Sequence, residues 1–406
     1  MSSDRETARH LFDIGVAAAD PVVAVRRALG IRGLAPLRGR RVILAIGKAA
    51  IAMLKGTDGM DADGVIVVTN PENAAPVQGA EVFAAGHPVP DQTGLKAGRA
   101  VLAALSDLGA HDQVLALISG GGSALLPAPA PGITLDDKVA VNKGLLASGA
   151  DITEMNLVRQ ELSALKGGGL LRAAAPAHVT ALILSDVIGD DLRVIASGPT
   201  VSPIGTRADA VAILKARGLW AGLPEAVRSH LSGPPGPDVA NAPEADNRLV
   251  GSNAISLAAM AAAAPGAHCH DRALIGDVEA AAARVLEAGP GLHLFGGETT
   301  VVLKGDGKGG RNQELALRVA MGAAAAGWHE WVFLSGGTDG RDGPVDAAGG
   351  LVDQLSVRRM QAAGIDLEQA LLRNDSYPVL KTAGDLLMTG GTGTNVADLQ
   401  VLIRRS

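Results

Sequence analysis

The chain has 406 residues, 47% of them hydrophobic, and a formal net charge of −6. This hydrophobic content is ample for compact folding and excludes a disordered chain. The acidic balance and an aromatic content of only 2% argue against binding to nucleic acid or to a membrane surface. A chain longer than about 300 residues favours two domains over one core.

Cys269 is the only cysteine, so no intrachain disulfide can form and a reducing compartment fits. The first residues, MSSDRETARHLFDIG, are charged and lack the continuous apolar segment of a signal peptide. The most alanine-rich run is too short to cross a bilayer. We therefore expect a cytoplasmic protein, and the sequence leaves homo-oligomerisation open.

Short runs of Val, Ile and Leu alternate with longer helical patterns, such as those over 91–109 and 311–327. This alternation is typical of a mainly parallel α/β sheet. Several runs are apolar on both faces, as expected for strands that are covered by helices on both sides. The predicted strands are 41–47, 64–69, 81–86, 113–119, 178–185, 248–252, 292–298, 299–304, 330–335 and 400–405.

The stretch LSGPPGPDVANAPEADN, residues 231–247, has no apolar period and is rich in Pro, Ala, Asp and Asn. We interpret it as a linker and a candidate hinge between two domains. The prediction places an N-terminal domain at 1–235 and a C-terminal domain at 248–406.

Glycine and small polar residues follow several predicted strands. In open α/β sheets, ligands bind beyond the carboxyl ends of the strands. Glycines allow backbone N–H groups to approach an anion closely, although tight turns alone could explain any single loop. Their recurrence favours a phosphate-type ligand. The strand ends are Gly47-Lys48, Ser119-Gly120-Gly121-Gly122-Ser123, Ser185-Asp186, Gly297-Glu298 and Ser335-Gly336-Gly337-Thr338-Asp339.

Charged residues stand at these same ends. Lys48 would direct its ammonium at a strand-end cleft, and Arg311, at the start of a predicted helix, suits carboxylate or phosphate binding. Asp339 and Asp342 could hold Mg²⁺, accept a proton or cap a helix. The acidic residues after the strand at 178–185 offer the same alternatives; they are Asp186, Asp190 and Asp191.

The remaining motifs are weaker indications of function. His87 is interpreted as a loop residue near the cleft, and His268–His270 (HCH) is poor zinc geometry. The chain has no G-x-x-x-x-G-K-[ST], and GGSAL lacks the last glycine of a nucleophile elbow. Gly305–Gly310 (GDGKGG) matches G-x-G-x-x-G, but a loop that presents the following GRNQE to a ligand explains it better than a dinucleotide site.

Taken together, these motifs resemble the glycerate 2-kinase family, whose C-terminal region is named MOFRL. The similarity runs from about residue 7 to the C-terminus. It rests on GKAA (47–50), AGHPVPD (85–91), SGGGSALL (119–126), NLVRQELSALKGGGL (156–170), LSDVIGDDLRVIASGPT (184–200), GGETTVVLKGDGKGGRNQELAL (296–317), SGGTDGRDGPVDAAGG (335–350) and TGGTGTNVADLQV (389–401).

The resemblance implies two α/β domains with an active site in the cleft between them. The N-terminal sheet would be Rossmann-like and mainly parallel, and the C-terminal MOFRL sheet mixed. The implied reaction is ATP-dependent phosphorylation of D-glycerate at its C2 hydroxyl, with a divalent ion such as Mg²⁺. Lys48 and Arg311 are the implied active-site pair.

Within that reaction, the glycine-rich ends would cradle ATP phosphates through Ser119–Ser123 and Gly336–Thr338. Glycerate would contact Lys48, Arg311 and Glu298. Asp186 or Asp339 would accept the C2 hydroxyl proton. The candidate magnesium ligands are Asp186, Asp190 and Asp339.

Two alternatives remain at this point. An NAD(P)H-dependent hydroxypyruvate reductase is suggested by GDGKGG and by a label that family members often carry. A non-catalytic ligand-binding protein is the other alternative, and the carboxylates and cations at strand ends in both halves weigh against it.

Overall fold

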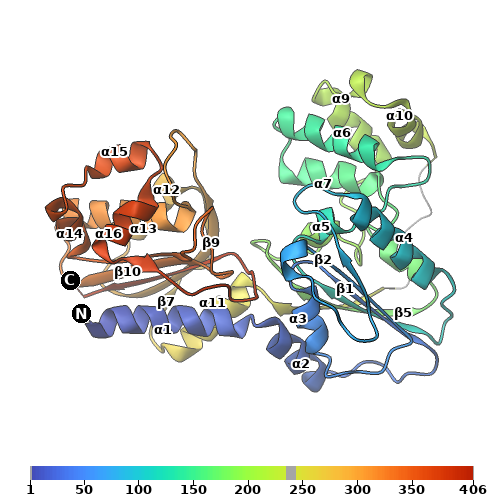
Figure 1. Cartoon of the computed structure of the whole chain (residues 1–406), viewed down its shortest axis with the longest axis horizontal. Coiled ribbons are helices and arrows are strands. Elements are labelled where there is room, and N and C mark those ends of the chain that lie inside the picture. Colours follow the sequence, from blue (N-terminus) through green and yellow to red (C-terminus); the bar gives the residue numbers. More distant parts are fainter. Residues whose placement is uncertain (1, 235–243, 406) are drawn as a thin grey trace. The chain divides into compact units, whose positions relative to one another are not determined.

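The computed structural model describes residues 2–234 and 244–405, and the chain forms two compact units (Figure 1). The central unit consists of Pro21–Val250. The terminal unit combines the residues up to Asp20 with those from Gly251 onward.

The two units contain both helices and strands. The helices of the central unit are α2 (Pro21–Ile31), α3 (Ala50–Lys55), α4 (Gln92–Ser106), α5 (Gly122–Leu125), α6 (Leu135–Ala147), α7 (Ile152–Glu161), α8 (Gly169–Ala174), α9 (Arg207–Ala216), α10 (Glu225–Ser232) and the short 3-10 helices η1 (Pro71–Asn73), η2 (Ile195–Ser197) and η3 (Trp220–Gly222). Its strands are β1 (Arg41–Ile46), β2 (Gly64–Thr69), β3 (Glu81–Ala84), β4 (Gln113–Ile118), β5 (His178–Leu184) and β6 (Asp246–Gly251). The terminal unit has helices α1 (Ser2–Ala18), α11 (Asn253–Ala263), α12 (Val278–Leu286), α13 (Arg311–Ala325), α14 (Ser356–Ala362), α15 (Leu367–Leu372) and α16 (Ser376–Ala383). Its strands are β7 (His268–Cys269), β8 (Leu274–Asp277), β9 (Gly291–Thr300), β10 (Trp331–Gly337), β11 (Gly349–Asp353), β12 (Leu386–Leu387) and β13 (Asp398–Arg404).

The central sheet has the order β3-β2-β1-β4-β5-β6, which is the strand order of a doubly wound Rossmann fold. The pairings among β1–β5 are parallel. Ile46 pairs with both Val68 and Ile118, so β1, β2 and β4 end at the same level. The residues that follow these strands therefore meet at one edge of the sheet.

Apolar strands and amphipathic helices build the core of this unit. Strand β4 is buried at every position, as expected for a strand covered on both faces. Helix α4 buries Ala97, Val101 and Leu105, which lie at the i, i+4, i+8 spacing of one helix face, in a cluster with residues of β1 and β2. Helices α6, α7, α9 and α10 share a separate apolar cluster and gather together in Figure 1.

The terminal sheet is mixed and has the order β12-β11-β10-β13-β9-β7, with β8 also paired to β9. Strand β13 runs antiparallel to both β10 and β9, whereas β7 and β8 are parallel to β9. Apolar residues of α12 and α13 cluster with Phe295 and Phe333 of this sheet. A second cluster joins the sheet to α1 and α11.

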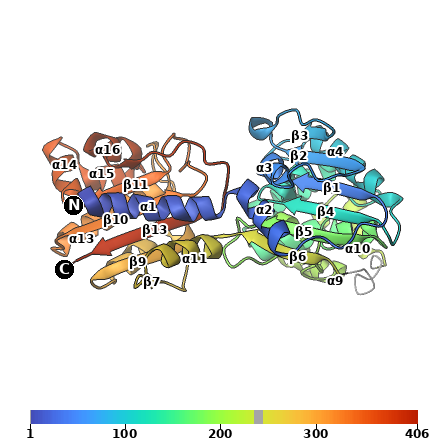
Figure 2. The same ribbon diagram turned by 90° about the horizontal axis from the view of Figure 1, so that it is seen from below.

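Helix α1 explains why the chain start belongs to the terminal unit. Ala8, Leu11 and Phe12 lie on one helix face and are buried with Leu334 and Leu399 of the sheet. Figure 2 shows α1 lying along β10 and β13. The prediction of an N-terminal domain at 1–235 did not foresee this, because the apolar period of α1 carries no information about its packing partner.

The predicted fold class is confirmed: a Rossmann-like parallel sheet and a separate mixed sheet. The predicted strand at 299–304 is wrong, because β9 continues to Thr300 and 301–304 has no regular structure. Residues 235–243 of the predicted linker lie outside the described residues. Its described flanks, α10 and all of β6 except Gly251, fall within Pro21–Val250, so the boundaries between the units differ from those predicted.

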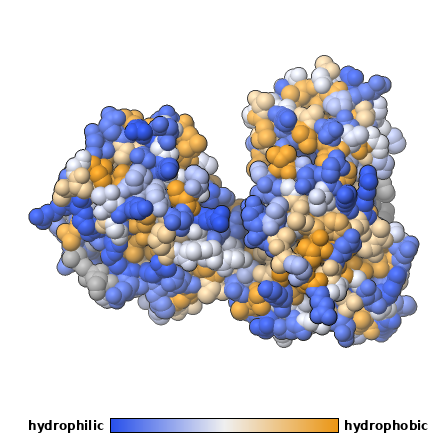
Figure 3. Space-filling view, in the orientation of Figure 1, coloured by the Kyte–Doolittle hydropathy of each residue, from blue (hydrophilic) through white to orange (hydrophobic). Residues whose placement is uncertain are grey.

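Within the described ranges, no helix is long and apolar enough to cross a membrane. Figure 3 shows polar and apolar residues interspersed over the visible face of each unit.

Candidate active site

The β1–β4 boundary is the point of the central sheet at which the strand order reverses, and ligands of doubly wound folds bind there. Lys48 is the second residue after β1, and its backbone N–H donates to the Gly120 carbonyl oxygen at 2.9 Å. Gly47 has φ +120°, and a Cβ there would lie 2.2 Å from the Ser119 Oγ. Glycine is therefore required for the two loops to meet.

The Lys48 side chain lies among residues of these loops. A Cβ placed on Gly121 would be 3.3 Å from both the Lys48 Cγ and the His87 Cδ2. Partial burial and the Lys48 ammonium lower the pKa of His87. The same ammonium contributes to a lowered pKa of Glu72, after the larger effects of hydrogen bonds from its own backbone and from Asn70. The positive charge of Lys48 therefore acts on the segments that follow β2 and β3.

The loop after β4 offers unused donors. Among the residues that the structure describes, no backbone carbonyl oxygen receives the N–H groups of Gly120, Gly121, Gly122 or Ser123. Gly121 has φ +85°. Successive free N–H groups in such a turn form an anion-binding concavity. This loop, Ser119–Ser123, is called the amide loop below.

The amide loop is held by a turn that the sequence did not single out. Ala196, Ser197 and Gly198 all have positive φ, between 50° and 64°. The left-handed conformation costs a non-glycine residue about 1 kcal/mol or more. A Cβ on Gly122 would lie 2.9 Å from that of Ala196, so loop and turn are in close contact. Strain of this kind tends to be kept at functional sites.

The acidic residues after β5 have different environments. A Cβ on Gly120 would be 2.0 Å from the Asp186 Oδ2, so this carboxylate lies against the amide loop. Asp190 has φ 54°, and its Oδ1 is buried without a hydrogen-bond partner among the described residues. Asp191 pairs with Arg193 at 2.7 Å, and that contact lowers its pKa. Asp186 and Asp190 thus remain as candidates.

In the terminal unit, Asp398 opens β13 between two glycines. It pairs with Gly297 inside β9 on one side and with Gly337 at the end of β10 on the other. Its carboxylate receives the Arg311 Nε at 2.7 Å and an Arg311 terminal nitrogen at 3.0 Å. The other terminal nitrogen donates to Glu298 at 2.8 Å. Arg311 is therefore fixed by two carboxylates while a third of its side chain stays exposed.

Burial sets the electrostatics of this group. The Asp398 side chain is 1% exposed. Burial raises its pKa to about 7, although Arg311 acts in the opposite direction. Burial alone would lower the pKa of Arg311, but Asp398 and then Glu298 outweigh it and the pKa rises. The sequence analysis missed Asp398, whose only signal was its place in the motif TGGTGTNVADLQV.

Asp342 has a structural explanation. Its carboxylate accepts the backbone N–H groups of Asn312 and Gln313 at 3.1 and 2.8 Å and so caps α13. Burial raises the pKa of Asp342, against these hydrogen bonds. A Cβ on Gly310 would lie 2.4 Å from Asp342, so this glycine allows the cap. Asp342 fixes the helix end that carries Arg311.

The loop after β10 differs from the amide loop. The N–H groups of Gly337 and Thr338 donate to Ala348 and Ala397, and Gly336 lies inside the paired strand. Thr338 is fully buried, and its hydroxyl donates to the Ala397 carbonyl oxygen. The N–H groups that the sequence analysis assigned to phosphate are thus used within the sheet. Asp339 is half-buried and accepts from the Arg341 N–H at 2.9 Å.

The GDGKGG loop also has a packing role. Gly307 donates to the Arg373 carbonyl oxygen, and a Cβ on Gly305 would be 2.4 Å from the Arg373 Cα. These glycines therefore let the loop rest on the segment before α16. Among the described residues, no three His, Cys, Asp or Glu side chains gather in metal-binding geometry.

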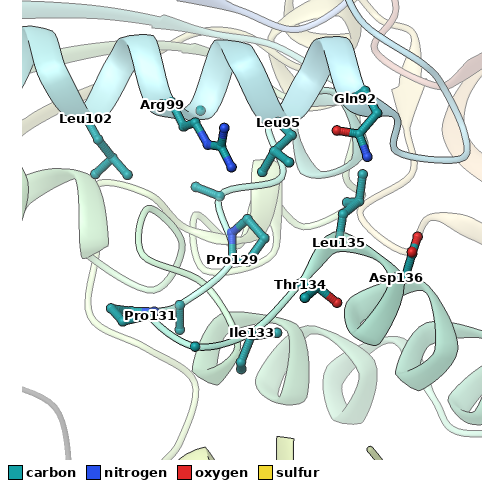
Figure 4. A pocket seen from close by; sticks show the side chains of 14 residues that line it. Gln92, Leu95, Arg99, Leu102, Pro129, Pro131, Ile133, Thr134, Leu135 and Asp136 are labelled. Atoms are coloured by element: carbon teal, nitrogen blue, oxygen red, sulfur yellow. The ribbon is translucent and has the colours of Figure 1, made fainter. Parts of the chain in front are cut away.

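A cavity of about 430 Å³ lies elsewhere in the central unit (Figure 4). Leu95, Arg99 and Leu102 of α4 form one wall, and the loop from Ala128 to Thr134 forms the other. No predicted site residue lines it. Its walls offer mainly apolar side chains, so we do not place the chemistry there.

A doubly wound unit with a lysine and free amides at its switch point, joined to a second α/β unit with a carboxylate-held arginine, belongs to the class of enzymes that act on anionic small molecules. Residues 7–232 match the family described as "Domain of unknown function (DUF4147)", and residues 291–398 match the MOFRL family. A "D-glycerate 2-kinase" of Thermotoga maritima is 39% identical to this chain, and the match covers 89% of this chain and 89% of that protein. A "Putative hydroxypyruvate reductase" of Agrobacterium vitis is 44% identical to this chain, and the match covers 99% of this chain and 94% of that protein.

The solved structures agree. A crystal structure of glycerate kinase from Thermotoga maritima matches with a TM-score of 0.92 at 36% identity and covers the whole of both chains. The chain therefore belongs to the glycerate 2-kinase family, as its motifs predicted.

Proposed function

We infer that the protein is a glycerate 2-kinase, which transfers the γ-phosphoryl group of ATP to the C2 hydroxyl of D-glycerate and releases 2-phospho-D-glycerate and ADP. The observation that carries this inference is the position of Lys48 beside the amide loop at the switch point of the central sheet. The family membership supplies the reaction.

Phosphoryl transfer depends mainly on positioning and on stabilisation of charge. We assign the ATP phosphates to the N–H groups of the amide loop. Lys48 and Arg311 bind the glycerate carboxylate and the transferred phosphoryl group, and Glu298 orients Arg311.

The proton of the C2 hydroxyl needs an acceptor. Asp186 lies against the amide loop, where the phosphates are assigned, and so suits a metal better than a proton. Asp339 lies near Asp398, the partner of Arg311. A Cβ on Gly337 would be 3.3 Å from the Asp339 Oδ1 and 3.6 Å from the Asp398 Oδ1. We therefore assign the proton to Asp339.

A divalent ion such as Mg²⁺ fits the central unit. Magnesium is commonly bound by one or two carboxylates together with substrate phosphates. Asp190 offers a buried oxygen without a partner among the described residues, and Asp186 lies beside the loop. These two residues would hold the ion, which offsets the phosphate charge when bound. The earlier candidate Asp339 belongs to the other unit.

The competing activity is NAD(P)H-dependent reduction of hydroxypyruvate, which the name of the Agrobacterium vitis relative favours. A Rossmann dinucleotide site carries G-x-G-x-x-G after its first strand. Here β1 is followed by Gly47-Lys48-Ala49-Ala50, and the only match, GDGKGG, is packed on Arg373 in the other unit. The structure thus gives the reductase no dinucleotide loop at the switch point.

Two assays on the same preparation test the proposal. ADP release from ATP should depend on D-glycerate, and NADH absorbance should stay constant with hydroxypyruvate. Lys48→Met should lower kcat/KM for glycerate at least 100-fold, with an unchanged melting temperature. NADH oxidation, or near-normal turnover by Lys48→Met, would contradict the assignment. We also propose a cytoplasmic site of action, supported by the exposed and unpaired thiol of Cys269.

A further inference from the structure

Lys166 is a buried lysine that the mechanism above does not use. It lies between α7 and α8 and is 5% exposed. Its Nζ is 2.8 Å from the Ser123 carbonyl oxygen and 2.9 Å from the Ser123 Oγ. Lys166 thus contacts the last residue of the amide loop through both its backbone and its side chain.

The contact continues as a chain of hydrogen bonds. The Ser123 Oγ is 2.8 Å from the Ser197 Oγ, and the Ser197 Oγ donates to the Asn156 Oδ1 at 3.0 Å. Because Ser197 gives its only hydroxyl proton to Asn156, Ser123 must donate to Ser197. The Ser123 Oγ can then accept a hydrogen bond from Lys166. Each group therefore donates to the next in the order Lys166, Ser123, Ser197 and Asn156.

This direction decides between two roles for Lys166. A lysine that activates Ser123 as a nucleophile would have to accept the serine proton. That proton is already directed at Ser197, so Lys166 acts as a donor. Burial lowers the pKa of Lys166 well below its usual value, with Lys138 and Arg159 adding to the effect. An amine with or without its extra proton can donate both hydrogen bonds.

This series of hydrogen bonds also includes a residue of the strained turn at Ala196–Gly198. Ser197 has φ 59°, and its neighbour Ala196 abuts Gly122. The N–H of Gly167, next to Lys166, donates to the Ser197 carbonyl oxygen at 3.0 Å. Lys166 and its neighbour therefore hold the amide loop and the turn behind it together.

We propose that Lys166 is a positioning residue for ATP: by donating to Ser123 it holds the amide loop with its N–H groups directed at the phosphates. This rests on the proposed function, in which that loop binds ATP. Lys138 provides a matched control. It donates to the Leu162 carbonyl oxygen at 2.9 Å, burial lowers its pKa to about 7, and it has no hydrogen bond to the amide loop.

The test is the dissociation constant of ATP with Mg²⁺, measured by calorimetry without glycerate. Lys166→Met should raise it at least tenfold, whereas Lys138→Met should stay within twofold of the wild type. Ser123→Ala keeps the carbonyl acceptor and should give a smaller rise of about threefold. The double variant should bind no more weakly than Lys166→Met, because both changes break one chain. In turnover assays, KM should rise for ATP and not for glycerate.

Equal effects of Lys166→Met and Lys138→Met, or a parallel rise in both KM values, would overturn the role. If Lys166→Met does not fold, an unchanged ATP affinity in Ser123→Ala overturns it instead. Covalent labelling of Ser123 by a fluorophosphonate would contradict the donor direction. Binding of ATP without transfer to glycerate would overturn only the proposed function, whereas a wild type that fails to bind ATP would overturn both.

Discussion

The raised pKa of Asp398 makes a quantitative prediction for Asp398→Asn. The ordinary pKa of the carboxyl is 3.8, and burial raises it to about 7 in the folded protein. Between these values the unfolded chain has released the proton and the folded chain retains it. Stability is therefore fully present below pH 3.8 and is lost as the pH rises towards 7.

The loss is about 1.4 kcal/mol per pH unit well below pH 7 and becomes smaller near pH 7, so the wild type loses about 2 kcal/mol from this group between pH 5 and pH 7. Asparagine has nearly the shape of the protonated acid and does not titrate. The variant should be within about 1 kcal/mol of the wild type at pH 5 and should gain about 2 kcal/mol relative to it by pH 7.

Urea unfolding measures this difference. Trp328 and Trp331 are buried in the terminal unit, so a Trp220→Phe background makes fluorescence report on that unit. Asp306→Asn is the control, because Asp306 is exposed and its hydrogen bond with Arg373 lowers its pKa. Its difference from the wild type should be flat between pH 5 and pH 8. A flat or falling difference for Asp398→Asn would refute the argument, since Arg311 would then outweigh burial.

Two further substitutions test the packing of α1 on its sheet and the role of the amide loop. Phe12→Ala should destabilise the terminal unit by about 3–5 kcal/mol, because Phe12 is fully buried against the sheet of that unit. The fluorescence of Trp328 and Trp331 should report this loss of stability. An equal loss reported by Trp220, in the central unit, would contradict the division into units. Gly120→Ala should weaken ATP binding at least tenfold, because the new Cβ would meet the Asp186 Oδ2 at 2.0 Å. Gly222→Ala, which has open space around it, should bind ATP normally, and similar affinities for both variants would argue against the amide loop.

The sequence predicted the fold class because hydrophobic periodicity and strand-end glycines are local signals. It also placed Lys48 and Arg311 at strand and helix ends, which the structure confirms as positions. It could not tell the free amides of Gly120–Ser123 from the paired amides of Gly337 and Thr338. That difference depends on which strands lie alongside, and both loops read as glycine after an apolar run.

Long-range partners explain the remaining misses. Asp398 becomes notable only when β13 places it between Gly297 and Gly337. Lys166 looks like a surface residue until α7 and the turn at Ser197 enclose it. The place of α1 in the terminal unit depends on contacts with strands more than 300 residues away in the 406-residue sequence.

A phosphorus NMR spectrum of the product from ATP and D-glycerate tests the central claim most directly. The account predicts a new phosphomonoester resonance coupled to the single proton on C2, formed by the wild type and absent with Arg311→Met. A resonance coupled to the two protons on C3, or ATP left intact with glycerate present, would contradict it.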